Sequence, residues 1–223
     1  MNDIRAILFD LDGTLIDSLP DIAAALNRAL EEFKLSRADT RDVRRWIGDG
    51  IVTLCERALA QQHAVERLVA FVPRMRMAYE ANAASETTCF PNIMQILDLL
   101  QVENIKSAVL TNKPHALTLQ ILDAMGLTSR FQCVKGYRNE SDKKPSPTQA
   151  LSIARELAIA PAQCVVVGDS PIDIETARRA GMHSIGVTWG YRDRSELDAA
   201  KPDAIIDDPL KIFSLLGLGK KNF

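Results

Sequence analysis

Two aspartates two positions apart, Asp10 and Asp12, follow a short apolar stretch near the start of the chain. In an extended chain, side chains at positions i and i+2 lie on the same face, so these carboxylates would point together, with Leu11 turned away. Carboxylates a few ångströms apart repel each other, which shifts at least one pKa unless a cation lies between them. Gly13 comes next and permits an unusual backbone turn. The pattern indicates a cation site or acid–base chemistry, although an acidic turn at the end of a strand fits these residues equally well.

Three later segments carry polar groups that suit a phosphate ester or a metal ion. Thr111 and Asn112 offer a hydroxyl and a backbone N–H after an apolar stretch, where they could hold a phosphate oxygen. Lys144 precedes a proline just before a helical pattern and could supply a point charge to a phosphate. Asp169 follows the most apolar stretch, and Asp173 lies near the next helix start, where the helix dipole favours negative charge. Each of the first two segments alone is more typical of an ordinary loop.

Short apolar stretches precede most of these residues and predict β-strands. The predicted strands cover residues 4–9, 107–110, 164–167, 184–188 and 204–206. Their nearly continuous apolar character is typical of strands buried on both faces, as in a parallel sheet. Helical patterns separate most of them from residue 91 onward, which predicts an α/β fold with crossover helices. Open α/β sheets place ligands at the carboxyl ends of their strands, so the strand-end motifs should meet at one edge, with the lysine loop beside them.

The segment of residues 18–89 interrupts this alternation and contains no good strand. It contains three one-sided helical patterns, at residues 22–33, 51–59 and 65–72. Pro73 is expected to kink or end the third helix. Ser18 and Pro20 have the residue types of a helix start, the first as the N-cap and the second in the first turn.

The position of this helical segment predicts how the chain divides into domains. The first strand already belongs to the sheet, so the helical segment is an insertion rather than a leading domain. We expect an α/β core of residues 1–16 and 90–223, with helices on both faces of the sheet, and an all-helical cap of residues 17–89. The two crossings between core and cap should act as hinges, with closure of the cap expelling water from the site.

Length, composition and charge exclude several classes of protein. The 223 residues are 47% hydrophobic and 25% charged, which is the ordinary globular balance and argues against disorder or a rod. With 27 Lys+Arg against 29 Asp+Glu, the chain has no electrostatic footprint for nucleic acid. No apolar run approaches the roughly 18 residues of a membrane span, and the first residues lack the pattern of a signal peptide. The four cysteines form no C-x-x-C pair and are expected to be reduced residues in or near the core. These features predict a cytoplasmic protein.

In this order, the motifs resemble those of the haloacid dehalogenase superfamily, in the branch with a helical cap inserted after the first motif. The similar segments are DLDGTLIDS at 10–18, TNKP at 111–114, KKPSP at 143–147 and GDSPIDIETARRAG at 168–181. Within the superfamily, RRWIGDG at 44–50 and the FPN and TNKP stretches are most similar to the phosphoglycolate phosphatase group. The resemblance implies a Rossmann-like core and hydrolysis of a small phosphomonoester, with 2-phosphoglycolate as the first candidate.

The resemblance also implies chemical roles for the aspartates. Asp10 would be the nucleophile that forms an aspartyl-phosphate. Asp12 would protonate the leaving alkoxide and then deprotonate the attacking water. Mg²⁺ would bind Asp10, the backbone carbonyl of Asp12 and Asp169, and would let an anionic carboxylate approach an anionic phosphate. Asp173 would support the metal side of the site.

By the same resemblance, Thr111, the backbone of Asn112 and Lys144 would hold the transferring phosphoryl group. Lys144 is preferred to Lys143 because the family's lysine directly precedes the proline. The implied partner is a small phosphorylated metabolite, with no nucleic acid or membrane, and the chain is expected to be a monomer or a homodimer.

Alternatives to this function remain open. A sugar phosphomutase, an isomerase, would share the aspartyl-phosphate but must exclude water, and RRWIGDG does not resemble the mutase cap pattern. A phosphatase of another substrate, such as a sugar phosphate, a nucleotide or pyrophosphate, fits the same motifs. A non-catalytic binding module would be expected to lose a motif carboxylate or the lysine, and this chain retains them all. Dehalogenases and phosphonatases of this superfamily lack a carboxylate at the position of Asp12.

The cap sequence contains a basic cluster with two interpretations. Its members are Arg37, Arg41, Arg44 and Arg45. They form either a solvated helix face or a group from which one arginine reaches a substrate carboxylate by bidentate pairing. Trp46 and the turn at Gly48–Gly50 lie where a specificity loop of the cap would be, but a helix-joining turn packed by Trp46 fits these residues equally well.

Overall fold

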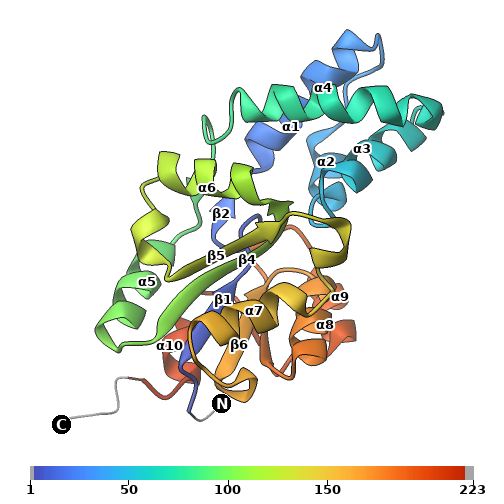
Figure 1. The fold of residues 1–223 in the computed structure, drawn as a ribbon. Coiled ribbons are helices and arrows are strands. Elements are labelled where there is room, and N and C mark those ends of the chain that lie inside the picture. The colour runs from blue at the N-terminus through green and yellow to red at the C-terminus, as the bar shows by residue number, and fades with distance from the viewer. Residues whose placement is uncertain (1–2, 219–223) are drawn as a thin grey trace.

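The computed structural model describes residues 3–218, and a six-stranded parallel sheet lies at the centre of its larger part (Figure 1). In spatial order the strands are β5 (Cys133–Tyr137), β4 (Lys106–Pro114), β1 (Ala6–Phe9), β6 (Cys164–Gly168), β7 (His183–Val187) and β8 (Ala204–Ile206). All neighbouring pairs are parallel. The two central strands β1 and β6 are buried along their whole length, which explains their continuous apolar sequences. The predicted α/β fold with a parallel sheet is confirmed.

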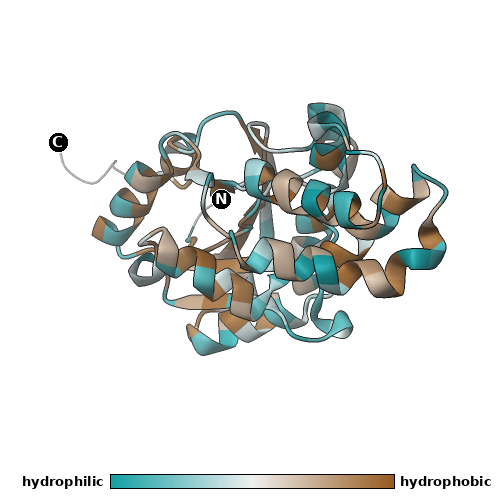
Figure 2. Cartoon of the chain, turned by 90° about the horizontal axis from the view of Figure 1, so that it is seen from above, coloured by the Kyte–Doolittle hydropathy of each residue, from teal (hydrophilic) through white to brown (hydrophobic). Residues whose placement is uncertain are grey.

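Helices cover both faces of this sheet. On the face that carries Ile7 and Phe9, the packed helices are α5 (Ile93–Val102), α6 (His115–Ala124) and α10 (Lys211–Leu215). On the face that carries Ala6 and Leu8, they are α7 (Thr148–Glu156) and α8 (Pro171–Ala180), with α9 (Arg194–Ala200) packed beside α8. Hydrophobic and hydrophilic residues alternate along the helices (Figure 2), as one-sided burial requires. Short 3₁₀ turns occur at Val65–Arg67, Thr128–Arg130, Glu140–Asp142 and Pro161–Gln163.

A helical region is inserted between two very short strands that follow β1. The strands β2 (Ile16–Asp17) and β3 (Thr88–Cys89) pair antiparallel, so the chain leaves and re-enters the sheet region side by side. Between them lie α1 (Leu19–Glu32), α2 (Thr40–Trp46), α3 (Ile51–Ala60) and α4 (Leu68–Glu80). The first and third of these helices both pack on α4, and the group lies above the carboxyl edge of the sheet in Figure 1.

The inserted helical region is therefore confirmed, and we call it the cap and the sheet with its helices the core. The division into residues 17–89 and residues 1–16 with 90–223 stays a prediction, as do the hinges. Residues 1–2 and 219–223 of the expected core lie outside the described residues. In the described part of the chain, no helix is long and apolar enough to cross a membrane. The four cysteines are free, as expected, and three of them are buried.

The structure differs from the sequence-based expectations at several elements. Strand β5 was not expected, because Lys135 and Gly136 interrupt its apolar pattern at the edge of the sheet. Strand β4 continues to Pro114, so Thr111 and Asn112 lie within the strand rather than after it. The strands β2 and β3 were not expected either, because two-residue strands show no alternation and pair only through the return of a distant segment.

Pro73 was expected to kink or end a helix, and the second of these expectations was wrong because the helix does not end there. Helix α4 continues through Pro73 to Glu80. A proline in a helix leaves the carbonyl four residues earlier without its N–H partner, here that of Val69. Val69 is 88% exposed, so water can reach that carbonyl. Ser18 is the N-cap residue of α1 as predicted, but its side chain makes no capping hydrogen bond.

Candidate functional site

The register of three adjacent strands brings the predicted site residues to one edge of the sheet. Phe9, the last residue of β1, pairs with Val109 of β4 and with Val167 of β6. Asp10 therefore lies one residue beyond this level, and Thr111 and Asp169 each lie two residues beyond it. Because the strands are parallel, all these positions are at the carboxyl edge, where α/β sheets bind ligands.

Three carboxylates and one ammonium form a buried group at this edge, which we call the carboxylate cluster: Asp10, Asp169, Asp173 and Lys144. Oxygens of the three aspartates lie within 4.8 Å of one another. The Nζ of Lys144 is 2.8 Å from Oδ1 of Asp10 and 2.6 Å from Oδ1 of Asp173. The side chain of Lys144 is only 3% exposed. One cation thus faces three buried carboxylates, which leaves the cluster with an excess of negative charge.

Burial and this excess shift the protonation equilibria of the cluster. Burial raises the pKa of Asp10 to about 6, although the charge of Lys144 opposes the rise. Burial also raises the pKa of Asp169 to about 7, with repulsion from Asp10 and Asp173 in the same direction. Burial works against the charge on Lys144, but Asp10 and Asp173 outweigh it and raise the lysine pKa above its usual value. A second cation near Asp10 and Asp169 would favour their ionised forms.

The donor set of the carboxylate cluster fits a hard divalent cation, and the cluster could hold a metal ion. Among the described residues, Oδ2 of Asp10 and Oδ1 of Asp169 have no hydrogen-bond partner. Asp173, in contrast, accepts from Lys144 through Oδ1 and from the backbone and hydroxyl of Ser170 through Oδ2. Carboxylate oxygens are the ligands that Mg²⁺ and similar cations prefer. Asp10 and Asp169 therefore fit as metal ligands, and Asp173 fits as a residue that fixes Lys144.

Gly13 lets the backbone of the first motif lie close to Asp169 of the carboxylate cluster. Its φ of +84° is unfavourable for residues with a side chain, and a Cβ there would lie 2.4 Å from Oδ2 of Asp169. The same oxygen of Asp169 accepts a hydrogen bond from the backbone N–H of Tyr191 at 2.6 Å. The unusual turn expected at Gly13 is confirmed, and its reason is contact with a carboxylate from another strand.

The side chain of Asn112 positions the lysine loop. Its Oδ1 accepts from the backbone N–H of Lys144 at 2.7 Å, and its Nδ2 donates to the carbonyl of Lys144 at 3.1 Å. The Nδ2 group also donates to the carbonyl of Gly48 in the cap at 3.3 Å. Since the amide is occupied in this way, the backbone of Asn112, rather than its side chain, is the part left to contact a ligand.

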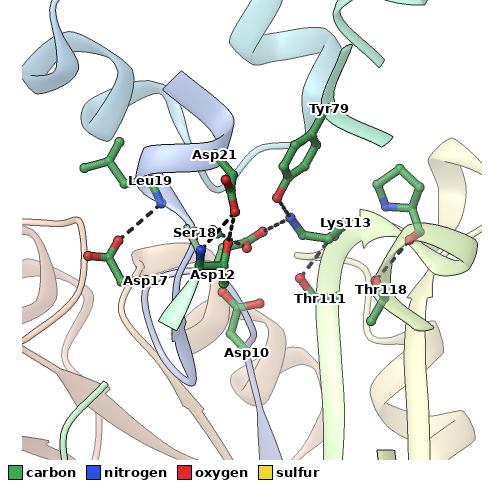
Figure 3. Close-up of polar contacts among 12 residues, drawn as sticks. Asp10, Asp12, Asp17, Ser18, Leu19, Asp21, Tyr79, Thr111, Lys113 and Thr118 are labelled. Atoms are coloured by element: carbon green, nitrogen blue, oxygen red, sulfur yellow. Dashed lines mark hydrogen bonds and ion pairs between the residues drawn. The ribbon is translucent and has the colours of Figure 1, made fainter. Parts of the chain in front are cut away.

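A second, largely buried group faces the cap, and we call it the cap-facing group: Asp12, Lys113, Ser18 and Tyr79 (Figure 3). The Nζ of Lys113 lies 3.0 Å from Oδ2 of Asp12 and donates to the hydroxyl of Tyr79 at 2.5 Å. The hydroxyl of Ser18 donates to Oδ1 of Asp12 at 2.5 Å. Burial opposes the charge on Lys113, but Asp12 and Tyr79 outweigh it and raise the lysine pKa. Burial raises the pKa of Tyr79 to about 12, against the effect of Lys113.

Lys113 and Tyr79 were missed by sequence reasoning. Lys113 lies two positions after Thr111, so in an extended strand both point to the same face. Ending the predicted strand at residue 110 hid this relation. Tyr79 belongs to α4, and no local signal in the sequence shows that its hydroxyl reaches a residue of the core.

A cavity of about 60 Å³ lies between the carboxyl edge of the sheet and the cap. Its polar lining is Asp10, Asp12, Thr111, Asn112, Lys113 and Tyr79. Its apolar lining is Ile22, Ile47, Ile51, Leu54, Met75, Pro114 and Leu117. Gly48 and Gly50 also line the cavity, so the turn singled out in the sequence does lie at the site. The cavity has room for only a few water molecules, which suits a small ligand.

The four arginines of the basic cluster in the cap do not line this cavity. Arg37 pairs with Glu31, and Arg41 pairs with Asp39. Arg44 donates to the carbonyl of Gly190 in the core at 2.6 Å. In the described structure, Arg44 therefore serves as a bridge between cap and core.

The loop around Tyr191 connects the carboxylate cluster to the cap. The hydroxyl of Tyr191 accepts hydrogen bonds from the backbone N–H groups of Ser18 and Leu19 at 2.8 and 3.1 Å. It donates a hydrogen bond to Asp17 at 3.0 Å. The next residue, Arg192, donates to two carbonyls of the cap segment that ends at Ile47. This loop thus contacts Asp169, the start of α1 and the end of α2.

Comparison with known proteins places this arrangement in a family. The family model described as haloacid dehalogenase-like hydrolase matches residues 7–187. A phosphoglycolate phosphatase of Escherichia coli K12 is 35% identical over 97% of this chain and 94% of its own length. A phosphoglycolate phosphatase of Pseudomonas putida is 36% identical over 92% of this chain and 76% of its own length.

Solved structures give the same result. A protein described as a predicted phosphoglycolate phosphatase from Haemophilus somnus matches 96% of this chain and 99% of its own, with a TM-score of 0.89 and 32% identity. A haloacid dehalogenase-like family hydrolase from Streptococcus pneumoniae matches 96% of this chain and 98% of its own, with a TM-score of 0.84 and 25% identity. The family match over most of the chain, the full-length relatives and the cluster of aspartates agree: the chain belongs to the haloacid dehalogenase-like hydrolases and is a phosphatase of that family.

Proposed function

We propose that this chain hydrolyses a small phosphomonoester through an aspartyl-phosphate on Asp10, with 2-phosphoglycolate as the substrate. The single observation that carries the reaction type is the surroundings of Asp10. It has one oxygen on Lys144 and one without a partner, and it lines the same cavity as Asp12 and Thr111. The substrate is supported by the names of the full-length relatives and by the small volume of the cavity.

In the first step, a carboxylate oxygen of Asp10 attacks phosphorus, an O–P bond forms, and the ester O–P bond breaks. Asp12 gives its proton to the leaving alkoxide. Thr111, the backbone of Asn112 and Lys144 hold the phosphoryl oxygens as charge develops on them. Asp10, the backbone carbonyl of Asp12 and Asp169 would hold a Mg²⁺ ion, which would supply the positive charge that lets two anions approach.

In the second step, Asp12 accepts a proton from water, and the water oxygen attacks phosphorus. The bond between phosphorus and Asp10 breaks, inorganic phosphate leaves, and the carboxylate of Asp10 is restored. Ser18 and Lys113 contact one oxygen each of Asp12, so they fix the orientation of its carboxyl group. Asp173 has no role in proton transfer in this scheme, because its oxygens hold Lys144 and Ser170.

The test is phosphate release from 2-phosphoglycolate and from p-nitrophenyl phosphate, in Mg²⁺, by wild type and by Asp10→Asn. Removal of a covalent nucleophile should lower kcat by at least about 10³-fold on both substrates. Asp123→Asn is the matched control, because Asp123 is exposed on α6, and it should keep wild-type turnover. Near wild-type turnover by Asp10→Asn would remove Asp10 as the nucleophile. Formation of a rearranged sugar phosphate in place of free phosphate would favour the phosphomutase alternative.

A further inference from the structure

Lys113 is a buried cation that the hydrolytic scheme does not require as a phosphate ligand. Its side chain is 3% exposed, and it lines the cavity above Asp10 and Asp12. An ammonium has three N–H donors, and two of them are directed to Asp12 and Tyr79. One donor of Lys113 is therefore available to a molecule that enters the cavity.

The rest of the cavity wall shows why this cation matters. Among the described residues that line the cavity, Lys113 is the only one with a positive charge, and most of the cap's contribution is apolar. Apolar walls alone would favour an uncharged leaving group, because they offer nothing to replace the hydration of an anion. A buried ammonium instead favours a leaving group that carries an anionic group within reach of that ammonium.

The position of that anion follows from Asp12. In the proposed reaction Asp12 contacts the ester oxygen of the substrate, and Lys113 is 3.0 Å from Asp12. In the phosphate ester of a short 2-hydroxy acid, a single carbon separates the ester oxygen from the carboxylate. An ammonium beside Asp12 is therefore within reach of a carboxylate at that position.

We propose that Lys113 is the specificity residue for substrates with a carboxylate next to the phosphate ester, and that Tyr79 is its positioning residue. This proposal rests on the proposed function. Tyr79 comes from α4 of the cap, and its ring also lies 4.5 Å from the Nζ of Lys113, measured to the ring centroid. The cap thus holds the ammonium against Asp12, and the carboxylate of a bound substrate takes the remaining donor. The substrate class is the O-phosphates of short 2-hydroxy acids, of which 2-phosphoglycolate is the smallest.

The experiment compares kcat and KM for 2-phosphoglycolate and for ethyl phosphate, which has the same short chain without the carboxylate. Wild type should prefer 2-phosphoglycolate in kcat/KM by about 30-fold or more, the effect of one buried charge pair. Lys113→Met should remove most of that preference, with the selective part of the loss in KM for 2-phosphoglycolate. Lys113→Arg keeps the positive charge and should retain part of the preference for 2-phosphoglycolate. Tyr79→Phe should lower the preference by about fivefold, as loss of one hydrogen bond does.

Lys143→Met is the matched control, because Lys143 is also largely buried near the site but pairs with Glu140 and lies over the ring of Tyr137. Its preference for 2-phosphoglycolate should equal that of wild type. An equal loss on both substrates in Lys113→Met would overturn the proposal, since it would show that Lys113 acts only through Asp12.

The wild-type measurement alone also decides the matter, whether or not the variants fold. Hydrolysis of ethyl phosphate by wild type as efficient as that of 2-phosphoglycolate would overturn the role of Lys113 and leave the phosphatase intact. Absence of hydrolysis of either compound and of p-nitrophenyl phosphate would overturn the proposed function and this inference together.

Discussion

The carboxylate cluster and the cap-facing group each contain a buried lysine beside a motif aspartate, but they are held in different ways. Lys144 contacts Asp10 and Asp173, and its backbone is fixed by Asn112, so all its partners belong to the core. Lys113 contacts Asp12 of the core and Tyr79 of the cap. The first group is complete without the cap, and the second is complete only when the cap is in place. In the proposed mechanism, the residues that contact the phosphoryl group are therefore held by the sheet edge, while the residues proposed for proton transfer and substrate choice depend also on the position of the cap.

Different parts of the fold explain this contrast. Asp10 and Asp169 directly follow strands β1 and β6, whose register aligns their ends. Tyr79 is 34 positions from Lys113 along the chain and meets it only through the packing of α4 above the sheet. The loop at Tyr191 and Arg192 links the two groups, because it contacts Asp169 as well as the cap.

The largest expected effect is loss of metal support from the carboxylate cluster. Asp169→Asn replaces an anionic ligand by a neutral one, and we expect kcat with Mg²⁺ to fall by at least about 10³-fold. Chelation of divalent ions should abolish wild-type turnover, and added Mg²⁺ should restore it. Titration calorimetry of Mg²⁺ binding to both proteins checks the physical cause. Unchanged Mg²⁺ affinity in Asp169→Asn would show that the metal ligands lie elsewhere.

The next effect concerns Lys144, whose removal leaves Asp10 and Asp173 facing each other without a cation. Lys144→Met should lower kcat by about 10²-fold or more, as loss of a phosphoryl-binding charge does. It should also destabilise the metal-free protein by about 3–5 kcal/mol, the cost of breaking a buried ion pair. Denaturant unfolding in a chelator measures the second effect. On ethyl phosphate, Lys113→Met should keep more of its kcat than Lys144→Met does. The reason is that Asp12, the partner of Lys113, also accepts a hydrogen bond from Ser18.

Stability of the metal-free protein should depend on pH through Asp10 and Asp169. Their folded-state pKa values, about 6 and about 7, lie above the ordinary value of 3.8. The native state thus binds more protons than the unfolded state, so this contribution is fully present below pH 3.8 and is lost as pH rises through 6 and 7. We expect the Tm in chelator to fall between about pH 5 and 7.5, and Mg²⁺ to recover it at the higher pH.

The control for this pH effect is Asp169→Asn, which removes one of the two titrating groups. Its Tm in chelator should fall less over the same interval. A fall as large as that of wild type would mean that the carboxylate cluster does not cause the pH dependence.

The smallest effect tests the link between the two groups. Tyr191→Phe removes the hydroxyl that accepts from Ser18 and Leu19, which leaves two N–H groups without that partner. We expect a loss of about 1–3 kcal/mol in the free energy of unfolding, with a change in kcat of only a few-fold. Tyr137→Phe is the matched control, since its hydroxyl has no hydrogen-bond partner among residues 3–218, and it should change stability by less than about 0.5 kcal/mol. Equal effects of the two variants would contradict the linking role of Tyr191.

Residues at strand ends were predictable from the sequence because the rules that place them are local. The apolar run before Asp10 ends at Phe9, and CVVV ends just before Gly168 and Asp169, so each carboxylate could be placed at a strand end before the register was known. Their convergence then followed from the parallel sheet. The chemical roles of these residues remain predictions that the experiments above test.

The cap-facing group was not predictable in the same way. Lys113 would have been found only if β4 had been extended to Pro114, and the polar sequence TNKP argues against extending an apolar strand. Tyr79 depends on the packing of α4, and β5 depends on pairing with β4 at a sheet edge rather than on its own pattern. Contacts between distant segments determine the extent of β4, the position of Tyr79 and the formation of β5. The periodicity of a single sequence does not show such contacts.

Covalent labelling of the nucleophile tests the central claim most directly. Wild-type protein mixed with 2-phosphoglycolate and Mg²⁺ is quenched in acid within the first turnover and treated with borohydride, which reduces a phosphorylated aspartate to homoserine. Peptide mapping by mass spectrometry then locates the reduced residue. We predict homoserine at Asp10, dependent on substrate and at no other aspartate. Homoserine at Asp12 or Asp169, or phosphate release without any reduced aspartate during turnover, would contradict the account.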